Sequence, residues 1–407
     1  MNPKPTIIYQ KSSLFSLTMV THQNLKDPQN SNHKHNVLIV GNYCHDVLLQ
    51  KGVVLAETLG GAASFISNVL NGLSISCHLI AKVGRDFKYE TSYDPVVVPT
   101  SRTTVFHAYF GSISDPDGHQ DRVLKRARAC DPIAPSDLPG DARFDYGMAV
   151  GIGGEILPET LEKMVEICDA VFVDIQSIIR VFDGIDGTVN LVPLKDSGFY
   201  HLLPRIGFLK ASSEEALFMD VEEVRKMCGV VVTHGKDGCE VYLRDGETMK
   251  ILPFLANQVD PTGAGDSFLG GFVAGLVQGL TVPDAALLGN LFGSITVGQI
   301  GLPKFDSRVL QRVKDEVQVR QMQCVNCCGR RDDDSKFVKP SGHEQFHASL
   351  CAAKLISTCS IQDCRRDLPS SPAIAGEQGS LPPYNGQPKL LHNTVYEEPI
   401  QTVHGKP

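Results

Sequence analysis

The sequence predicts an α/β protein, in which a parallel β-sheet is built from strands joined by crossover helices. Its 407 residues are 42% hydrophobic, which is enough to bury one large core and leaves length for further segments. From Phe144 onward, short apolar runs alternate with amphipathic ones, as in YGMAVGIGG, PETLEKMVEICDA and VFVDI. This alternation is typical of parallel strands connected by helices. Near the start of the chain, the β-branched run VLIVG at residues 37–41 is expected to be the strand that opens this sheet.

The composition argues against several classes of protein. A net charge of -8 and an isoelectric point near 5.9 do not suit a broad nucleic-acid or membrane surface, so we expect neither partner. No apolar run reaches the roughly 18 residues that a membrane-spanning helix needs. The 12 cysteines are scattered and no convincing signal peptide precedes them, which indicates reduced thiols in a cytoplasmic protein. An organellar transit peptide near the N-terminus, or a start at Met19, stays open.

We divide the chain into three parts. Residues 1–35 are polar and predict a disordered extension, whereas residues 36–318 carry the strand and helix patterns of one large domain. Within that domain, β-forming residues followed by the turn-rich DPDGHQDR predict a small lid of strands at approximately residues 96–125. Beyond this domain, residues 319–407 are rich in Cys, Ser, Pro and charge, so we expect a disordered tail.

Two stretches near the first strand suit a binding site. Asp46 lies in GNYCHDVLL, where a carboxylate either caps a turn or accepts hydrogen bonds from the hydroxyl groups of a substrate. Gly60 and Gly61 stand before a helix pattern, where paired glycines also serve simple packing. These residues alone leave both interpretations open.

Three further motifs are equally ambiguous by themselves. Glu215 lies in ASSEEALF, whose S-x-x-E spacing fits a capping box at the start of a helix. Thr233, Gly235 and Gly238 form a tight turn between two β-rich runs in GVVVTHGKDGCEVY. Asn290 is a polar position in the helix pattern AALLGNLFG, which core packing explains equally well.

The stretch VDPTGAGDSFLGGFVAGL at residues 259–276 is the most informative one. Gly263 and Gly265 let backbone N–H groups converge on an anion, and the apolar helix that follows places its positive dipole end at the same point. Asp266 is then either an N-terminal cap or the proton acceptor of a phosphoryl transfer. Capping requires neither the flanking glycines nor Asp260, so the whole string favours the proton acceptor.

Two common nucleotide motifs are missing from the sequence. Gly151, Gly153 and Gly154 lack the third glycine and the acidic residue of a dinucleotide-binding fingerprint. The chain also has no G-x-x-x-x-G-K-[ST] motif. Any ATP site must therefore use another architecture.

The string DPTGAGDSFLGGFVAG resembles the C-terminal signature of the ribokinase-like (PfkB) carbohydrate kinases. The resemblance implies a three-layer α/β/α sheet with a small β-strand lid, and an ATP-dependent kinase that acts on a small polyhydroxylated acceptor. It implies Asp266 as the catalytic base and Asp260 near a monovalent cation such as K⁺. The amides of Gly263, Ala264 and Gly265 would form the anion hole.

The remaining motifs follow in the order found in this family, and the resemblance implies a role for each. Asp46, Gly60 and Gly61 would bind the acceptor. Glu215 would organise magnesium-bound water, so MgATP is the implied phosphoryl donor. The implied nucleotide-binding residues are Thr233, Gly235, Gly238 and Asn290.

The chain also departs from the family pattern. Phe65 stands where the family has an asparagine that contacts the substrate, Ser212 replaces the asparagine of N-x-x-E, and VGRDFKYET lacks the last glycine of V-G-x-D-x-x-G. Four stretches of the chain are similar to the branch of the family that phosphorylates myo-inositol with ATP: GNYCHDVLL, LGGAASFISNVL, KASSEEA and VDPTGAGDSFLGGFVAGL. Loss of the sugar-contacting asparagine agrees with a cyclitol acceptor.

Three functional hypotheses follow. The first is a small-molecule kinase, a monomer or homodimer, that acts on myo-inositol or on another sugar or nucleoside, and the retained Asp266 favours it. The second is a catalytically inactive kinase fold that serves as an interaction protein, which Phe65 and Ser212 suggest. The third is a zinc-dependent nucleic-acid binder, although the spacer between its ligand pairs lacks the apolar core that lets a zinc finger fold. Its ligands would be Cys324, Cys327, His343 and His347.

Overall fold

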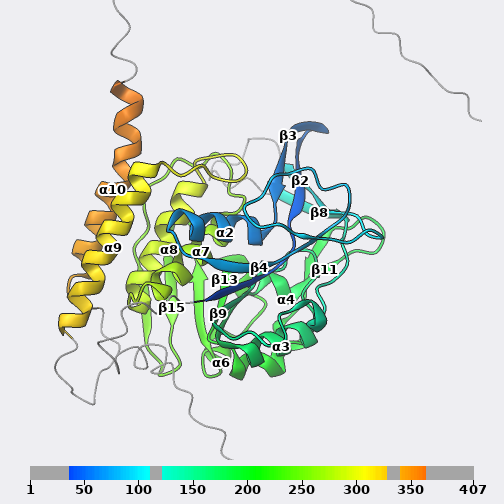
Figure 1. Cartoon of the computed structure of the whole chain (residues 1–407), viewed down its shortest axis with the longest axis horizontal. Helices are drawn as coiled ribbons and strands as arrows, with labels where there is room; N and C mark the ends of the chain where they lie inside the picture. Colours follow the sequence, from blue (N-terminus) through cyan, green and yellow to red (C-terminus); the bar gives the residue numbers. More distant parts are fainter. Residues whose placement is uncertain (1–35, 111–121, 328–339, 364–407) are drawn as a thin grey trace, which may run out of the picture. The chain divides into compact units, whose positions relative to one another are not determined.

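The computed structural model describes residues 36–110, 122–327 and 340–363 (Figure 1). The main sheet has eight described strands in the order β16-β15-β14-β13-β10-β9-β1-β4. Neighbouring strands from β4 to β14 are parallel, and β15 and β16 add an antiparallel edge. The strands are β1 (Val37–Val40), β4 (Cys77–Ile80), β9 (Phe144–Ala149), β10 (Cys168–Asp174), β13 (Phe208–Ser212), β14 (Gly229–Thr233), β15 (Cys239–Tyr242) and β16 (Thr248–Ile251).

Helices cover both faces of this sheet, which confirms the predicted three-layer α/β/α fold. All four residues of β1 are buried, and they face the two core clusters alternately, as expected for a strand covered on both sides. One cluster includes residues of α2 (Ala62–Gly72), α7 (Ala264–Val277), α8 (Val282–Thr296), α9 (Ser307–Cys327) and α10 (His343–Asp363). The other includes residues of α3 (Pro158–Ile167), α4 (Gln176–Ile179), α6 (Val221–Val224) and the 3-10 helix η4 (Tyr200–Arg205).

Short elements complete the described chain. These are β5 (Lys82–Val83), β6 (Val96–Val97), η2 (Pro135–Asp137), β11 (Arg180–Phe182), β12 (Val189–Leu191), η3 (Leu194–Asp196), α5 (Ser213–Ala216) and η5 (Gly235–Asp237). None of the helices in the described residues is long and apolar enough to cross a membrane.

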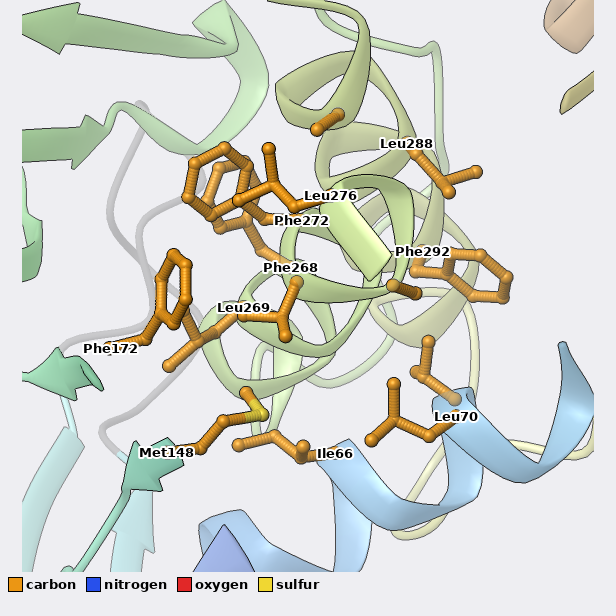
Figure 2. Close-up of a cluster of buried hydrophobic side chains, with 14 of the residues drawn as sticks. Ile66, Leu70, Met148, Phe172, Phe268, Leu269, Phe272, Leu276, Leu288 and Phe292 are labelled. Atoms are coloured by element: carbon orange, nitrogen blue, oxygen red, sulfur yellow. The ribbon is translucent and has the colours of Figure 1, made fainter. Parts of the chain in front are cut away.

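Helix α7, which begins in the glycine-rich signature, is packed on several sides. Its glycines permit close helix contact: a Cβ at Gly271 would lie 2.8 Å from the carbonyl oxygen of Leu288 in α8. The α7 N-terminus is therefore held in place by the core. Figure 2 shows the apolar side chains of α7 among those of α2, α8 and the sheet: Phe268, Leu269, Phe272 and Leu276 with Ile66, Leu70, Met148, Phe172, Leu288 and Phe292.

A separate sheet forms the predicted lid, but it is larger than expected. Its four described strands lie in the order β3-β2-β7-β8, and the prediction of a lid within residues 96–125 missed β2 and β3. Because β2 follows β1 after only three residues, the sequence there reads as the end of a core strand rather than as a new sheet. The strands are β2 (Cys44–Gln50), β3 (Val53–Gly60), β7 (Thr104–Phe110) and β8 (Arg122–Arg128).

The C-terminal part of the chain contains more helix than the sequence indicated. Helix α9 continues to Cys327, and α10 begins at His343, so the expected disordered tail does not hold for these residues. Phe346, Leu350 and Ala353 are buried in the main core, and their three- and four-residue spacing is that of one helical face. The expectations for residues 1–35 and 364–407 lie outside the described residues.

Candidate active site

A cavity lies between the lid, the carboxyl ends of main-sheet strands and the N-terminus of α7. We call it the lid cavity. It brings together the two carboxylates that the sequence analysis assigned to acceptor binding and to proton transfer, Asp46 and Asp266. The other polar side chains in its wall are Gln176, Arg180 and Thr262, and its larger apolar side chains are Leu48, Phe65, Phe106, Leu124 and Ile152.

Asp46 reaches the cavity from lid strand β2 and is 9% exposed. Gly60, the last residue of β3, and Gly61, which follows it, make room for this arrangement. A Cβ at Gly60 would overlap the Asp46 carboxylate, and a Cβ at Gly61 would overlap the carbonyl oxygen of Asn42. Gly61 lines the cavity directly, whereas Gly60 acts by leaving space for Asp46.

The turn before α7 borders the same cavity. Gly263 adopts φ 75°, a left-handed conformation that favours glycine, and a Cβ there would overlap the ring of Phe65. No side chain caps this helix among the described residues, so the N–H groups of its first turn remain suited to an anion. Phe65, at the position of the missing asparagine, therefore both lines the cavity and packs against the predicted anion hole.

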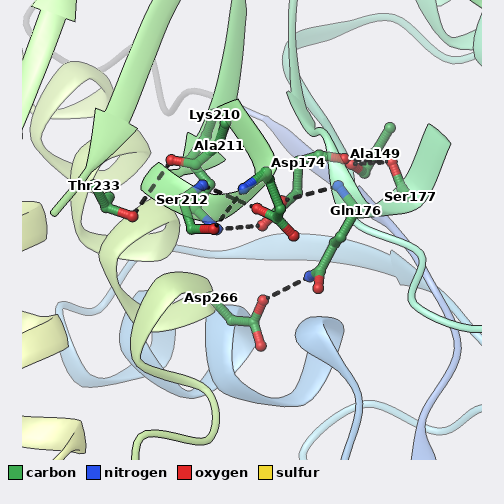
Figure 3. A network of polar contacts seen from close by, with 10 residues as sticks. Ala149, Asp174, Gln176, Ser177, Lys210, Ala211, Ser212, Thr233 and Asp266 are labelled. Atoms are coloured by element: carbon green, nitrogen blue, oxygen red, sulfur yellow. Dashed lines mark hydrogen bonds and ion pairs between the residues drawn. The ribbon is translucent and has the colours of Figure 1, made fainter. Parts of the chain in front are cut away.

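Asp266 is oriented by a neighbour that the sequence analysis did not identify. Gln176 Nε2 donates a hydrogen bond to Asp266 Oδ1 at 3.0 Å, and the other carboxylate oxygen points away from Gln176 (Figure 3). Burial raises the pKa of Asp266, while Lys210, Arg180 and the Gln176 hydrogen bond oppose the rise. A raised pKa makes this carboxylate a better proton acceptor than an ordinary aspartate.

A buried ion pair lies behind the glycine turn (Figure 3). Lys210 Nζ is 3.0 Å from Asp174 Oδ2, and the two residues are partners on the parallel strands β10 and β13. A Cβ at Gly265 would lie 2.7 Å from Lys210 Nζ, which places the ammonium group directly against the predicted anion hole. Burial lowers the pKa of Lys210, but Asp174, Glu215 and Asp266 outweigh burial and raise it. Burial also raises the pKa of Asp174, while the neighbouring Lys210 opposes the rise.

Glu215 forms the capping box that its spacing suggested. Ser212 Oγ accepts a hydrogen bond from Glu215 N at 3.2 Å, and Glu215 Oε2 accepts one from Ser212 N at 2.9 Å. The negative charge of Glu215 also acts on Asp174 and Lys210, so it stands near the buried ion pair. Its predicted role near magnesium stays a prediction.

The predicted nucleotide-binding residues lie beside the lid cavity rather than in its wall. Thr233 ends β14 and is paired with Ser212 of β13, so this turn adjoins the Glu215 motif. A Cβ at Gly238 would overlap the carbonyl oxygen of Ile251, and Asn290 Nδ2 donates to the Leu252 carbonyl at 2.9 Å. Gly235 has φ 54° and begins η5. Asn290 thus holds the chain after β16, and its predicted contact with adenine is untested.

Asp260 is buried just before the glycine turn. Thr262 N donates to its Oδ1 at 2.9 Å, whereas Oδ2 is buried and takes no hydrogen bond from the described residues. A buried carboxylate oxygen of this kind suits a cation.

Four polar residues of the candidate site were missed by sequence reasoning: Asp174, Gln176, Arg180 and Lys210. A signal for two of them was present, because Asp174 is a charged residue at the end of the buried strand β10 and Lys210 is a buried charge within the short strand β13. Gln176 begins the short helix α4 and Arg180 begins β11, both shortly after β10, and no sequence motif distinguishes them.

The histidines of the candidate zinc motif take part in other contacts. His343 Nδ1 lies 2.7 Å from Asp284 Oδ1, and His347 Nε2 lies 3.0 Å from the carbonyl oxygen of Pro253. The side chains of Cys324 and Cys327 lie outside the described residues. No group of three or more His, Cys, Asp or Glu side chains within the described residues could hold a metal ion.

Known proteins resemble this chain in sequence. Residues 192–305 match the model of the pfkB family of carbohydrate kinases. The chain is 66% identical to an inositol 3-kinase of Arabidopsis thaliana over 318 residues, which are 78% of this chain and 87% of that protein. It is 48% identical to an inositol 3-kinase of Oryza sativa subsp. japonica over 347 residues, 83% of this chain and 85% of that protein.

Solved structures share the fold. A pyrophosphate-dependent kinase of the ribokinase family, complexed with a pyrophosphate analogue and myo-inositol, matches with a TM-score of 0.55 and 18% identity, over 66% of this chain and 97% of that one. A probable sugar kinase from Rhizobium etli CFN 42 matches with a TM-score of 0.56 and 19% identity, over 70% of this chain and 99% of that one. At these identities the matches establish a ribokinase-like fold.

Proposed function

This chain belongs to the pfkB family of carbohydrate kinases, and we propose that it transfers a phosphoryl group from ATP to a hydroxyl group of myo-inositol, with inositol 3-phosphate as the product. One observation carries the proposal: a single cavity contains a buried lid carboxylate, Asp46, and a carboxylate of raised pKa, Asp266, at the edge of an anion-binding turn. The two inositol 3-kinases that resemble most of the chain support this choice of acceptor.

The lid cavity suits a cyclitol. A cyclitol presents C–H groups on its ring faces and hydroxyl groups around its rim, so it needs an apolar wall together with a few convergent polar groups. Phe65, Phe106 and Leu124 supply the wall. Asp46 can accept hydrogen bonds from ring hydroxyls, and Arg180 can donate them.

Asp266 would remove the proton of the reacting hydroxyl. As the hydroxyl oxygen forms a bond to the terminal phosphorus of the donor, the bond from that phosphorus to the bridging oxygen breaks, and the proton passes to Asp266. Gln176 holds one carboxylate oxygen and so aims the other. The N–H groups of the turn at residues 263–265 and the Lys210 ammonium behind it would stabilise the charge on the transferred group.

The described residues could hold Mg²⁺ only indirectly, through bound water and the phosphates of the donor. One oxygen of Glu215 is used in the capping box, and no described cluster forms a complete protein cage for a metal. When bound with the donor, Mg²⁺ would neutralise phosphate charge. For a monovalent cation, the buried Oδ2 of Asp260 is a suitable oxygen ligand.

The test is an acceptor and donor panel with the purified full chain. Myo-inositol, scyllo-inositol, ribose, fructose and adenosine are each supplied with MgATP or with magnesium pyrophosphate, and acceptor-dependent release of ADP or phosphate is measured. We expect the highest kcat/KM for myo-inositol with MgATP, and loss of activity when EDTA removes the metal. A sugar or nucleoside that outperforms myo-inositol would overturn the acceptor assignment. No acceptor-dependent release with any pair would instead favour an inactive interaction protein.

A further inference from the structure

We infer that helix α10, through His347 and Lys354, is a positioning element for the phosphoryl-donor side of the site. The inference rests on the proposed function, in which the turn at residues 233–238 and Asn290 form the phosphoryl-donor side of the site. It adds a role for a C-terminal helix that the motifs of the chain do not cover. It also assigns that role to two named side chains.

The element that α10 contacts is the segment of residues 252–259, which we call the donor segment. It connects β16 to Asp260 and the glycine turn, and its residues form no regular helix or strand. Since it has few ladder hydrogen bonds of its own, its backbone must be held by other groups. One edge adjoins the predicted nucleotide turn, because a Cβ at Gly238 would lie 3.0 Å from Pro253 N.

Side chains from two helices hold three carbonyl groups of this segment. From α8, Asn290 Nδ2 donates to the Leu252 carbonyl at 2.9 Å. From α10, His347 Nε2 lies 3.0 Å from the Pro253 carbonyl oxygen, and Lys354 Nζ donates to the Leu255 carbonyl at 2.6 Å.

Two further contacts add to this anchorage. The His347 ring also packs edge-on against Phe254, with 4.7 Å between ring centroids. Lys354 Nζ further donates to Ser294 Oγ of α8 at 2.8 Å, so one ammonium group ties the segment, α8 and α10 together.

Helix α10 is itself firmly anchored at its start. Asp284 of α8 is fully buried, and its two carboxylate oxygens bind different helices: His343 Nδ1 of α10 at 2.7 Å and Arg320 Nε of α9 at 2.8 Å. Arg320 Nη1 also donates to the Ser341 carbonyl at 2.7 Å. Farther along, Phe346 and Leu350 are buried in the main core. The helix can therefore act as a fixed support from which His347 and Lys354 hold the donor segment.

The contacts that α10 makes should affect binding of the phosphoryl donor and not binding of the acceptor. Neither the donor segment nor α10 contributes a described residue to the wall of the lid cavity. Loosening the segment should therefore weaken donor binding while the acceptor site and the catalytic carboxylate stay in place. A general loss of folding would affect both substrates together.

Two substitutions test this separation. Lys354→Met keeps the length of the side chain and removes its donors, and His347→Phe keeps a ring against Phe254 and removes the hydrogen bond. We expect each to raise the KM for MgATP and the Kd for a fluorescent ADP analogue by roughly threefold to tenfold, tenfold being about 1.4 kcal/mol. The KM for myo-inositol and kcat should change by less than about twofold, because no acceptor contact is lost. Lys354→Arg, which retains a cation and its donors, should restore most of the donor affinity.

Lys314→Met is the matched control. Lys314 lies on α9 and donates to Ser74 Oγ at 3.0 Å, so it also joins a C-terminal helix to a loop, but it does not contact the donor segment. It should leave donor affinity unchanged. Unchanged donor affinity in Lys354→Met and His347→Phe, or a parallel weakening of both substrates with a lowered Tm, would overturn the inference. If the unaltered chain does not bind the ADP analogue, the proposed function itself fails, which is a different result.

Discussion

The lid cavity and the donor segment are positioned by opposite means. Around the cavity, glycines leave space that larger side chains occupy: Gly60 accommodates Asp46, and Gly263 accommodates Phe65. Along the donor segment, side chains of α8 and α10 reach out to hold backbone carbonyl groups, as Lys354 does for Leu255. The cavity should therefore respond sharply to small changes in shape, whereas the donor segment should respond gradually to the loss of single hydrogen bonds.

The largest effect is expected at Asp266, the proposed base in the wall of the lid cavity. Asp266→Asn keeps the size of the side chain but removes the proton acceptor, so kcat should fall by roughly 10²- to 10⁴-fold. The substitution should disturb neither the lid cavity nor the donor segment, so calorimetric titration should still show binding of both myo-inositol and ADP. Loss of binding along with turnover would mean that Asp266 supports the site and does not act as the base.

Lys210→Met tests the buried ion pair behind the glycine turn. It leaves the Asp174 carboxylate buried without its cation, so the free energy of unfolding from urea denaturation should fall by about 3–5 kcal/mol. Adding Asp174→Leu removes the uncompensated charge, and it should recover much of the stability but not the activity. Recovery of activity in the double variant would show that the Lys210 charge is not used in transfer.

Gly60→Ala tests whether space is what positions the acceptor carboxylate. The new Cβ would overlap Asp46, so kcat/KM for myo-inositol should fall by roughly 100-fold, mostly through KM, while donor affinity is retained. Gly140→Ala is the matched control, since a Cβ at Gly140 has no neighbour within 4 Å. An unaltered KM in Gly60→Ala would contradict this view of the cavity.

Gln176→Leu should give the smallest change in rate and a diagnostic change in pH dependence. Loss of one hydrogen bond to a carboxylate should lower kcat/KM at neutral pH by roughly tenfold, or about 1.5 kcal/mol. Asp266 must be deprotonated to act as a base, and the Gln176 hydrogen bond opposes the rise in its pKa. Without that bond the pKa rises further, so activity should be lost at a higher pH on acidification. A pH profile of kcat/KM that stays in place would show that Gln176 does not bond to the active carboxylate.

The turn before α7 was the most predictable part of the site. Its glycines and Asp266 are contiguous in sequence, and local backbone chemistry defines what such a turn can do. The three-layer fold was predictable for a similar reason, because buried parallel strands read as continuous apolar runs. The capping box at Glu215 is likewise local and was confirmed by the structure.

Contacts between distant segments could not be predicted in the same way. Gln176 meets Asp266 only because β10 ends and α7 begins at the same edge of the sheet. The lid strand β2 was hidden because it follows β1 so closely. Helix α10 was hidden because the face that it buries in the core is marked by few large side chains, chiefly Phe346 and Leu350. The importance of Phe65 was visible as a departure from the family pattern, but its packing against Gly263 required the structure.

We propose that phosphoryl transfer from ATP to myo-inositol takes place in the lid cavity, with Asp266 as the base. The most direct test of this claim is to incubate the unaltered chain and the Asp266→Asn variant with ATP labelled at the γ-phosphate and with myo-inositol, and to separate the products on a chiral phase, because the 1- and 3-phosphates are mirror images. We predict that labelled inositol 3-phosphate forms with the unaltered chain, and that almost none forms with Asp266→Asn. Equal labelling by the two proteins, or label found only in free phosphate, would contradict the claim.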